Sequence, residues 1–594
     1  MSAPTVADFL LERLAAWGVD RVFGYPGDGI NGIAAALRRR QEAFDFVQVR
    51  HEETAGFLAG AYVKYGGAPL GVCLATSGPG AVHALNGLYD AKMDGQPVLA
   101  LVGQQARTVL GGSYYQEIDL ASLYKDVAGA YVETAIHPAQ MRHLVDRAVR
   151  IALAERTVTA LIIPNDLQEA KAVTDAPAEH GRLRSSVGFS APRVVPERAD
   201  LERAAELLNS GSRTAMLVGR GALGATAEVR AVAEALGAGV AKALLGRTVL
   251  DDREPFVTGA IGLLGTTASW HLMQECDTLL MVGSNLPYSE FLPPEGAARA
   301  VQIDLDGRRL GFRYPTELNL VGDSAATLRE LLPLLEGRTP ARDTWRAQVE
   351  GWVRDWHETV RGRAEQPAHP INPQKVVTEL DARLPANAMI ACDTGTATGY
   401  FARDLTLGPS HLAWLSGNLL TMGSGLPYAI AAKIAHPDRP AIALIGDGAM
   451  QMNGLGELVT VQQRWRSWSD PRLIVVVFNN RDLNFVTWEQ RVMEGEPKFA
   501  QSQDLPDVPY ADYAKLLGLD GARVEKPEDL GAVWDAALSA DRPFVIDAVV
   551  DPNVPPLPPH ITREQAKNMT SALLEGDPDR RGVISQAFRQ LLGG

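Results

Sequence analysis

Two short polar motifs follow apolar, β-branched runs in the last third of the chain. Gly446-Asp447-Gly448 comes directly after residues 441–445, and Asn479-Asn480 closes the run over residues 473–478. Because ligands lie beyond the carboxyl ends of strands in an open parallel sheet, a carboxylate and an amide would share one edge. Both are hard oxygen donors that suit Mg²⁺ or Ca²⁺, and the glycines would let a diphosphate approach the backbone. The alternative is a solvated Asp-Gly turn and an unrelated asparagine pair.

A second group of candidate residues lies in the first 90 residues. His51-Glu52-Glu53 stands between a strand-like run and a helical pattern. A glutamate in the first turn of a helix is favoured by the helix dipole, so capping alone would explain it. Gly24–Gly32 and Thr76–Gly80 are glycine-rich turns before helices, and His83 and Asn86 follow the second turn. Thr, Ser and Asp are good N-caps, which leaves simple capping turns as the alternative.

Parallel sheets are needed to bring these motifs together, and the sequence predicts such sheets. Short apolar runs alternate with helical patterns, which indicates βαβ units with helices on both faces. Polar stretches over 166–200 and 336–372 read as linkers, so we expect an α/β protein with three doubly wound parallel-sheet domains. Their expected bounds are 1–185, 190–340 and 365–552, with a helical tail over 553–594. The expected strands include 47–49, 71–75, 98–102, 160–163, 215–218, 278–282, 300–303, 389–392, 441–445, 473–478 and 544–550; the expected helices of the first domain are 8–17, 54–64, 80–92 and 140–154.

The composition excludes several classes of function. With 57 basic and 71 acidic side chains, the net charge is −14, so we expect no nucleic-acid partner. Apolar residues at 46% and charged residues at 22% predict packed domains and not a disordered chain. Three distant cysteines without a Cys-x-x-Cys pair argue against a zinc site or a disulfide framework. No apolar run reaches the ~18 residues of a membrane span and no basic leader region is present, so we expect a cytoplasmic protein.

Taken together, the motifs resemble those of thiamine diphosphate-dependent enzymes. The glutamate segment, the Gly-Asp-Gly and Asn-Asn pair and the order of the blocks match that family over nearly the whole chain. Residues 463–471 lengthen the usual spacing between the two metal motifs, yet both stay at strand ends. The chain is most similar to the pyruvate oxidase and pyruvate:quinone dehydrogenase group, with acetolactate synthases as near neighbours. The segments that carry this similarity are Gly27–Gly32, Ile261–Gly265, Gly283–Tyr288, Gln302–Asp304 and Ile561–Lys567.

The resemblance implies that thiamine diphosphate binds between the first and third domains. Glu52 would hydrogen-bond the pyrimidine ring and promote loss of the thiazolium C2 proton, for which it must be buried. Glu53, or capping alone, is the alternative. Asp447 and Asn480 would bind Mg²⁺ through their side chains, and Asp482 through its backbone carbonyl. The residues implied to contact thiamine diphosphate are Glu52, Pro26, Thr76, His83, Thr394, Gly395, Leu420, Thr421, Met422, Asp447, Gly448, Ala449, Asn480, Leu483, Asn484 and Phe485.

Further roles are implied around the substrate. Met422 would support the bend between the two coenzyme rings, unless it is an ordinary core methionine. Gln116, next to Tyr115, and Phe485 would face a 2-oxo acid. Many relatives carry glycine where Asn484 stands, so the resemblance does not extend to substrate preference near that position.

The second domain contains Gly219-Arg-Gly221-Ala-Leu-Gly224 after a strand-like run, which matches the Gly-x-Gly-x-x-Gly pattern of dinucleotide sites. The acids that follow, Glu228 and Glu234, lie too close for the usual ribose position. Resemblance to flavin-contacting segments favours FAD over NAD, with Asp304 at the adenosine ribose. Some relatives keep this domain without redox use or bind other nucleotides. The implied FAD residues are Gly219, Gly221, Ile261, Gly262, Leu263, Leu264, Ser284, Asn285, Leu286, Pro287, Tyr288 and Asp304.

The implied reaction is oxidative decarboxylation of pyruvate, or a similar 2-oxo acid, to acetate or acetyl phosphate. Electrons would pass to FAD and then to a quinone or O₂. One alternative is a carboligase of the acetolactate synthase type with structural FAD; another is a non-catalytic nucleotide-binding protein. In the family the coenzyme lies between two subunits, so a homo-oligomer, either a dimer or a tetramer, is implied.

The C-terminal tail bears on the electron acceptor. Apolar residues recur there at helical spacing, with arginines nearby. In quinone-reducing relatives such a segment contacts the membrane, whereas the alternative is a helix packed on its own subunit. Peripheral attachment at the inner face of the cell membrane is therefore the alternative to a wholly cytoplasmic protein. The apolar positions are Val583, Ile584, Ala587, Phe588, Leu591 and Leu592.

Overall fold

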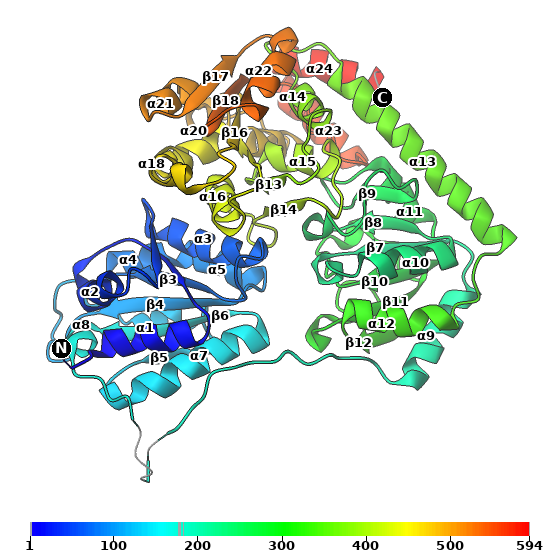
Figure 1. The fold of residues 1–594 in the computed structure, drawn as a ribbon. Helices are drawn as coiled ribbons and strands as arrows, with labels where there is room; N and C mark the ends of the chain where they lie inside the picture. Colours follow the sequence, from blue (N-terminus) through cyan, green and yellow to red (C-terminus); the bar gives the residue numbers. More distant parts are fainter. Residues whose placement is uncertain (1–2, 176–179, 182, 593–594) are drawn as a thin grey trace.

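The computed structural model describes residues 3–175, 180–181 and 183–592. In this part of the chain, three bodies each contain a six-stranded parallel sheet (Figure 1). Apolar clusters lie on both faces of each sheet, because helices cover both sides. The predicted α/β class, with three parallel-sheet units and a helical tail, is confirmed.

The first body is coloured blue to cyan in Figure 1. Its sheet order is β2-β1-β3-β4-β6-β5, so the chain reverses direction across the sheet between β1 and β3. The strands are β1 (Arg21–Gly24), β2 (Asp45–Gln48), β3 (Gly71–Ala75), β4 (Val98–Gln104), β5 (Val132–Thr134) and β6 (Val158–Pro164). The helices are α1 (Val6–Ala16), α2 (Asn31–Arg39), α3 (Glu52–Lys64), α4 (Pro79–His83), α5 (Leu85–Met93), α6 (Leu120–Tyr124), α7 (Met141–Glu155) and α8 (Asn165–Glu169).

The second body has the strand order β12-β11-β10-β7-β8-β9. Numbered within this body, that order is the 3-2-1-4-5-6 arrangement of dinucleotide-binding sheets read from the other edge, with the reversal between β7 and β10. The strands are β7 (Thr214–Val218), β8 (Gly239–Lys242), β9 (Val257–Ala260), β10 (Thr278–Val282), β11 (Arg299–Asp304) and β12 (Leu318–Val321). The helices are α9 (Arg198–Ser210), α10 (Thr226–Leu236), α11 (Thr267–Glu275) and α12 (Ser324–Leu331), and the long α13 (Pro340–Ala364) leads to the third body.

The third body repeats the topology of the first, with the order β14-β13-β15-β16-β18-β17 and a reversal between β13 and β15. Its strands are β13 (Met389–Cys392), β14 (Leu412–Leu415), β15 (Ala441–Gly446), β16 (Leu473–Asn479), β17 (Asp520–Val524) and β18 (Phe544–Val549). Its helices are α14 (Pro373–Asp381), α15 (Thr396–Arg403), α16 (Gly425–Ala435), α17 (Asp447–Ala449), α18 (Leu455–Arg464), α19 (Asn484–Glu489), α20 (Ala500–Gln503), α21 (Tyr510–Leu516) and α22 (Leu530–Leu538).

The first and third bodies pack directly on each other. One apolar cluster runs from α3 and α5 into α16, so their cores are continuous. Helices α3 and α5 approach each other closely at Gly56 and Gly87. A Cβ atom on Gly56 would come within 2.8 Å of the carbonyl carbon of Gly87. The absence of side chains at these two positions brings the α3–α5 pair into a compact layer. Helices α3 and α16 thereby belong to the same interface, where Lys64 at the end of α3 donates to the Tyr428 hydroxyl of α16.

Two local predictions need correction. The single helix predicted over 80–92 is divided into α4 and α5 at Ala84. The linker predicted over 166–200 contains most of α8 and the start of α9. Both departures arise because polar and glycine-containing sequence folds into short helices when it packs on a sheet.

The C-terminal tail forms α23 (Arg563–Leu574) and α24 (Arg580–Leu592) after a proline-rich stretch with neither helix nor strand. Arg491 in the third body makes a buried ion pair with Asp577 of the tail, at 2.8 Å. In α24, Val583 is buried and Gln586 donates to the carbonyl of Pro367, whereas Ile584 is exposed. The side chains of Phe588, Leu591 and Leu592 lie outside the described part of the chain. No helix among the described residues is long and apolar enough to cross a membrane.

Candidate active site

The topology gathers the predicted motifs at strand ends. In the third body, β13, β15 and β16 are neighbours, and each is followed by a polar or glycine-rich segment. These segments begin at Asp393, Asp447 and Asn480. In the first body, β1 and β3 are neighbours and lead into Gly24–Gly32 and Thr76–Gly80. Both groups lie at the reversal point of their sheet, the usual ligand position in such folds.

The first metal motif supplies a buried carboxylate. Asp447 is 3% exposed, and its two oxygens accept the backbone N–H groups of Gly448 at 2.8 Å and Arg481 at 2.6 Å. The second bond joins Asp447 to the loop that carries Asn480. Burial raises the pKa of Asp447 to about 7, although these N–H groups act in the opposite direction. The side-chain oxygen of Asn480 accepts the N–H of Asp482 at 3.0 Å, so the loop joined to Asp447 also carries a hard amide oxygen. A desolvated carboxylate and such an oxygen are donors that suit a divalent cation.

The side chain of Asp482 is already engaged within the protein. Asn484 donates to it at 2.9 Å and Thr487 at 2.8 Å, and the Lys498 ammonium group lies 3.1 Å away. The Asn484 amide nitrogen also donates to the carbonyl of Pro552 at 2.9 Å. These contacts leave the backbone carbonyl of Asp482 as the group available to a cation. They also show that the amide nitrogen of Asn484 holds the loop together.

The segment after β13 provides room beside the metal motif. A Cβ atom on Gly395 would meet no heavy atom within 4 Å, and its φ of 139° is one that L side chains rarely adopt. The hydroxyl of Thr394 is buried without a protein partner. Because buried hydroxyls are nearly always hydrogen-bonded, this group fits a ligand such as a phosphate oxygen.

Apolar side chains pack against the Gly-Asp-Gly turn. A Cβ atom on Gly448 would come within 2.7 Å of the Leu483 side chain and 3.2 Å of the Met422 methyl group. Met422 is half-buried and packs against the apolar cluster shared by the first and third bodies, so its coenzyme role stays a prediction beside that of a core methionine. It is well placed to support a ligand that extends from the metal loop toward the first body. Ala449 is buried within α17.

Glu52 occupies the first position of α3 and its side chain is only 10% exposed. Its Oε2 lies 3.0 Å from Nδ1 of His83, and a Cβ atom on Gly80 would come within 2.9 Å of Oε1. His51, the preceding residue, is the N-cap and accepts the N–H of Glu53. Because His51 is the N-cap, the alternative that is left for Glu52 is the favourable effect of the helix dipole on an acid in the first turn.

Glu53 points into the contact between the bodies. It accepts hydrogen bonds from Asn86 and from Asn453, the latter at 3.2 Å. Asn86 also donates to the hydroxyl of Thr421 at 2.9 Å. The segment that holds Thr421 and Met422 therefore lies directly against the start of α3. Sequence reasoning missed Asn453 because nothing in its neighbourhood marks it.

A further set of contacts fixes Arg50, in the segment that leads into α3. The backbone N–H of Arg50 donates to the buried carboxylate of Glu457 at 2.8 Å, and its guanidinium group donates to Thr460 and Gln463. These residues belong to α18 and its C-terminal end. Within a single chain, the glutamate segment is thus already docked on the third body. The oligomer that the resemblance implies stays a prediction.

Strained backbone also marks these segments. Five non-glycine residues in the described part of the chain have positive φ, and three of them fall here: Gln116, Leu420 and Arg481. Such conformations cost of order 1 kcal/mol each and persist where surrounding structure imposes them, commonly at ligand sites. Helices α17 and α19 both continue into five-residue π-turns, a second feature frequent at functional sites.

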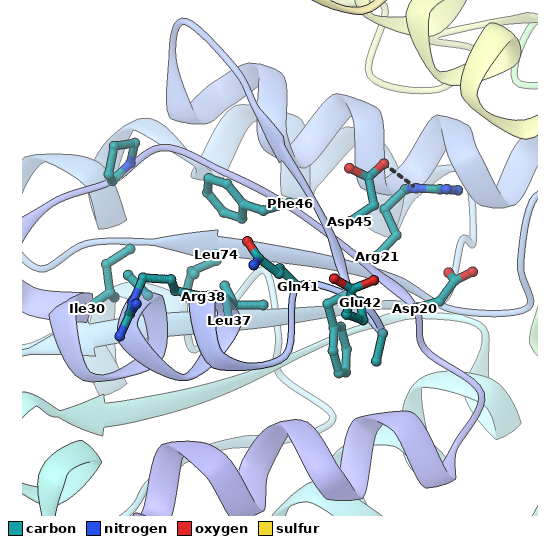
Figure 2. A pocket seen from close by; sticks show the side chains of 14 residues that line it. Asp20, Arg21, Ile30, Leu37, Arg38, Gln41, Glu42, Asp45, Phe46 and Leu74 are labelled. Atoms are coloured by element: carbon teal, nitrogen blue, oxygen red, sulfur yellow. Dashed lines mark hydrogen bonds and ion pairs between the residues drawn. The ribbon is translucent and has the colours of Figure 1, made fainter. Parts of the chain in front are cut away.

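The remaining predicted residues lie in three places. Thr76 accepts the N–H of Gly29 at 3.1 Å, and Gln116 accepts the Ser77 hydroxyl at 3.1 Å, so both belong to the turns of the first body. Phe485 is half-buried in α19. Pro26 instead lines a cavity of about 680 Å³ along edge strand β2, where Figure 2 shows Phe46 and Leu74. Neither Glu52 nor the metal motifs contribute to that cavity.

The second body has its own strand-end site. The turn after β7 packs against the turn after β10, since a Cβ atom on Gly221 would come within 2.7 Å of Gly283. Asn285 has a buried side-chain oxygen without a protein partner, and Asp304 ends β11 on the same sheet edge. Arg220, in the first turn, is half-buried and donates to the carbonyl of Gly95 in the first body at 3.4 Å; desolvation lowers its pKa to about 10. A half-buried cation and an unpaired acceptor at the reversal point fit a dinucleotide.

The other residues predicted to contact FAD differ in how exposed they are. Leu263 and Leu264 are half-buried, and the Cβ position of Gly262 lies 3.6 Å from the Tyr288 ring. Pro287 and Tyr288 are exposed. The remaining predicted positions, all buried, are Ile261, Ser284 and Leu286.

Comparison with known families covers all three bodies. Residues 4–123 match the model described as thiamine pyrophosphate enzyme, N-terminal TPP binding domain; thiamine pyrophosphate is another name for thiamine diphosphate. Residues 201–331 match the central domain, and residues 393–548 match the C-terminal TPP binding domain. The three matches occur in the order of the three sheets.

Full-length relatives show the same arrangement. YdaP of Bacillus subtilis, provisionally named a thiamine pyrophosphate-containing protein, is 35% identical over 97% of this chain and 96% of its own. A pyruvate oxidase of Lactiplantibacillus plantarum is 30% identical over 96% of this chain and 92% of its own. An acetolactate synthase large subunit of Parasynechococcus marenigrum is 29% identical over 92% of this chain and 88% of its own.

Proposed function

Because this chain belongs to the thiamine pyrophosphate-dependent enzyme family, we propose that it oxidatively decarboxylates pyruvate or a similar 2-oxo acid. The products are acetate or acetyl phosphate, and the electrons pass through FAD to a quinone or O₂. The observation that carries this proposal is the 30% identity with a pyruvate oxidase over 96% of the chain. The dinucleotide-type strand order of the second body supports it independently.

We assign the diphosphate and its Mg²⁺ to the third body. Asp447 and Asn480 bind the metal through side-chain oxygens, and Asp482 binds it through its carbonyl. Thr394 and Gly395 hold phosphate oxygens, for which the unpaired Thr394 hydroxyl and the open space at Gly395 provide the fit. When bound, thiamine diphosphate supplies an acidic carbon that adds to a ketone carbonyl and accepts the electron pair left by decarboxylation.

The first body supplies the acid. Glu52 holds a proton toward the pyrimidine ring, and its burial keeps water from competing for that hydrogen bond. Segment 416–422 would line the other side of the ring. Met422, whose methyl group lies 3.2 Å from the Cβ position of Gly448, would stand between the ring and the metal loop. Gln116 and Phe485 face the substrate from the first and third bodies.

FAD is proposed for the second body. The Gly219–Gly221 turn and the Gly283–Asn285 turn meet at the reversal point, and the Arg220 guanidinium group lies near Asp304 there. Excess positive charge at this point suits a diphosphate, and Asp304 suits a ribose hydroxyl. The active protein is proposed to be a homo-oligomer, as in the family.

Anaerobic addition of pyruvate is expected to bleach the flavin absorbance of the purified protein. Acetate or acetyl phosphate should form in proportion, because each turnover passes two electrons to the flavin. The measurement is an absorbance spectrum before and after pyruvate, with product analysis. A flavin that stays oxidised while acetolactate accumulates would instead establish the carboligase, which the 29% identity with an acetolactate synthase favours as second candidate.

Contact between the C-terminal tail and a membrane would favour a membrane-bound electron acceptor, whereas a tail packed on its own subunit favours a dissolved one. Contact of α24 with its own subunit through Val583 and Gln586 favours a helix packed on the protein. We therefore expect little binding to anionic liposomes. Membrane contact would be indicated by liposome binding that disappears both on removal of residues 571–594 and in Ile584→Glu. The substitution is the control, since it keeps the buried Arg491–Asp577 pair that the deletion breaks.

A further inference from the structure

A buried ionic cluster lies where α3, α5 and the third body meet. Lys64, the last residue of α3, has a fully buried side chain. Its ammonium group lies 2.6 Å from the Asp94 carboxylate and 3.1 Å from the carbonyl of Leu415, and it also donates to the Tyr428 hydroxyl. The three protons of the ammonium group thus have three acceptors, two of them from the third body. None of these groups takes part in the chemistry proposed above.

Asp94 holds the start of segment 416–422. Its carboxylate accepts the backbone N–H groups of Gly417 at 3.1 Å and Asn418 at 3.0 Å, and the Asn418 amide at 2.6 Å. Although burial alone would raise the pKa of Asp94, Lys64 and these donors lower it. Asp94 is therefore an ionised, fully hydrogen-bonded carboxylate that reaches from the first body into the third.

The other end of the segment is held by a second buried carboxylate. Asp393, at the end of β13, accepts the N–H groups of Gly423 at 2.9 Å and Gly425 at 2.7 Å. Between the two attachments lie Leu420, with its positive φ of 56°, and Met422. Asp393 belongs to the same body as the segment, whereas Asp94 belongs to the body that carries Glu52. Asp94 ties the start of the segment to that body, and Asn86, which donates to the Thr421 hydroxyl at 2.9 Å, ties the end.

The link to Glu52 runs along one helix. Helix α3 begins at Glu52 and ends at Lys64, and its 13 residues span about 20 Å at 1.5 Å per residue. A helix with a close-packed face is a stiff spacer, and α3 packs on both α5 and α16. A displacement of the Lys64 end of α3 is therefore transmitted along the helix to the Glu52 carboxyl group. Proton-transfer geometry is sensitive to such shifts, and a misplacement of 1 Å can cost about 100-fold in rate.

We propose that Lys64 and Asp94 are positioning residues that fix segment 416–422 relative to α3 and so set the spacing between Glu52 and the pyrimidine ring. This inference rests on the proposed coenzyme site. Neither residue touches the coenzyme; each acts through the segment or the helix that it holds.

The test uses the full-length double variant Lys64→Met/Asp94→Asn, which removes both charges of this pair. The buried Asp90 carboxylate, 3.6 Å from the Lys64 ammonium group, loses that cation in the variant but keeps the Tyr428 hydroxyl as a hydrogen-bond donor. The matched control of the double variant is Arg13→Met/Asp146→Asn, a pair at 2.7 Å in the same body between α1 and α7. The single variant Asp94→Asn, which keeps the side-chain volume, is the substitute if the double variant does not fold. Folding is checked by thermal unfolding of each.

Two readouts separate positioning from general stability. Amide hydrogen exchange without coenzyme should be about tenfold faster over residues 416–422 in the double variant and unchanged in the control. With saturating Mg²⁺ and thiamine diphosphate, exchange of the thiazolium C2 proton should slow by about tenfold or more, again with no change in the control.

The outcomes are distinct. Wild-type rates in both readouts for a folded double variant, or equal losses in the control pair, would overturn the positioning role. If the wild-type protein does not bind the coenzyme or accelerate C2 exchange, the proposed function fails. The amide exchange over 416–422 still decides whether Lys64 and Asp94 hold that segment.

Discussion

Glu52→Gln is expected to bind Mg²⁺ and thiamine diphosphate normally and to lose most of its turnover. Glutamine keeps the size of the side chain and can still form hydrogen bonds, but it cannot hold or give up the proton. General acid–base groups contribute about 10²- to 10⁴-fold, so the loss in kcat should fall in that range. Steady-state rates and coenzyme titration by calorimetry measure the two effects separately.

The matched control is Glu53→Gln, since Glu53 is adjacent in sequence and was the alternative acid. Its carboxylate accepts from Asn86 and Asn453, so the variant should weaken the contact between the bodies without removing proton transfer. Near-normal turnover in Glu52→Gln together with a large loss in Glu53→Gln would transfer the role to Glu53. Near-normal turnover in both would remove the segment from the mechanism.

Asp447→Ala is expected to raise the Mg²⁺ and thiamine diphosphate concentrations needed for half-maximal binding by about 100-fold or more. The Asp447 carboxylate is the only anionic group among the three proposed ligand groups, since Asp482 binds through its backbone carbonyl. Loss even of an outer-shell partner costs about 10- to 100-fold. Titrations of each ligand at saturating concentration of the other measure the effect.

An exposed acid in the loop that follows serves as the control. Asp504, with a side chain 58% exposed, pairs with Lys498 and is not a proposed ligand. Asp504→Asn should therefore bind both ligands as the wild type does. Unchanged affinity in Asp447→Ala, or an equal loss in Asp504→Asn, would contradict the metal assignment.

The central strands could be predicted from sequence because their environment is uniform. Strands such as β4, β6 and β16 are buried on both faces, so their residues are continuously apolar. Strands that escaped prediction are short or lie at sheet edges. Edge strand β12 has alternate residues exposed, and β17 includes Asp520 and Arg523, so neither carries the apolar run.

In the candidate site, too, some residues could be predicted from the sequence and others could not. Asp447, Asn480 and the glycine turns could be predicted because topology alone places strand ends at one edge. The contacts between the bodies could not, because they join distant residues without a local signal. Arg50 and Glu457 are 407 positions apart, and Lys64 and Leu415 are 351 apart. In the sequence, Lys64 resembles any basic residue at a helix C-terminus.

The most direct test of the central claim is an experimental structure of the protein with thiamine diphosphate and Mn²⁺, located by its anomalous signal. The account predicts the ion on Asp447, Asn480 and the carbonyl of Asp482, at roughly 2.0–2.2 Å. It also predicts the carboxyl group of Glu52 within about 3 Å of the pyrimidine ring nitrogen. A coenzyme bound elsewhere, or a Glu52 side chain remote from every such ring in the assembly, would contradict it.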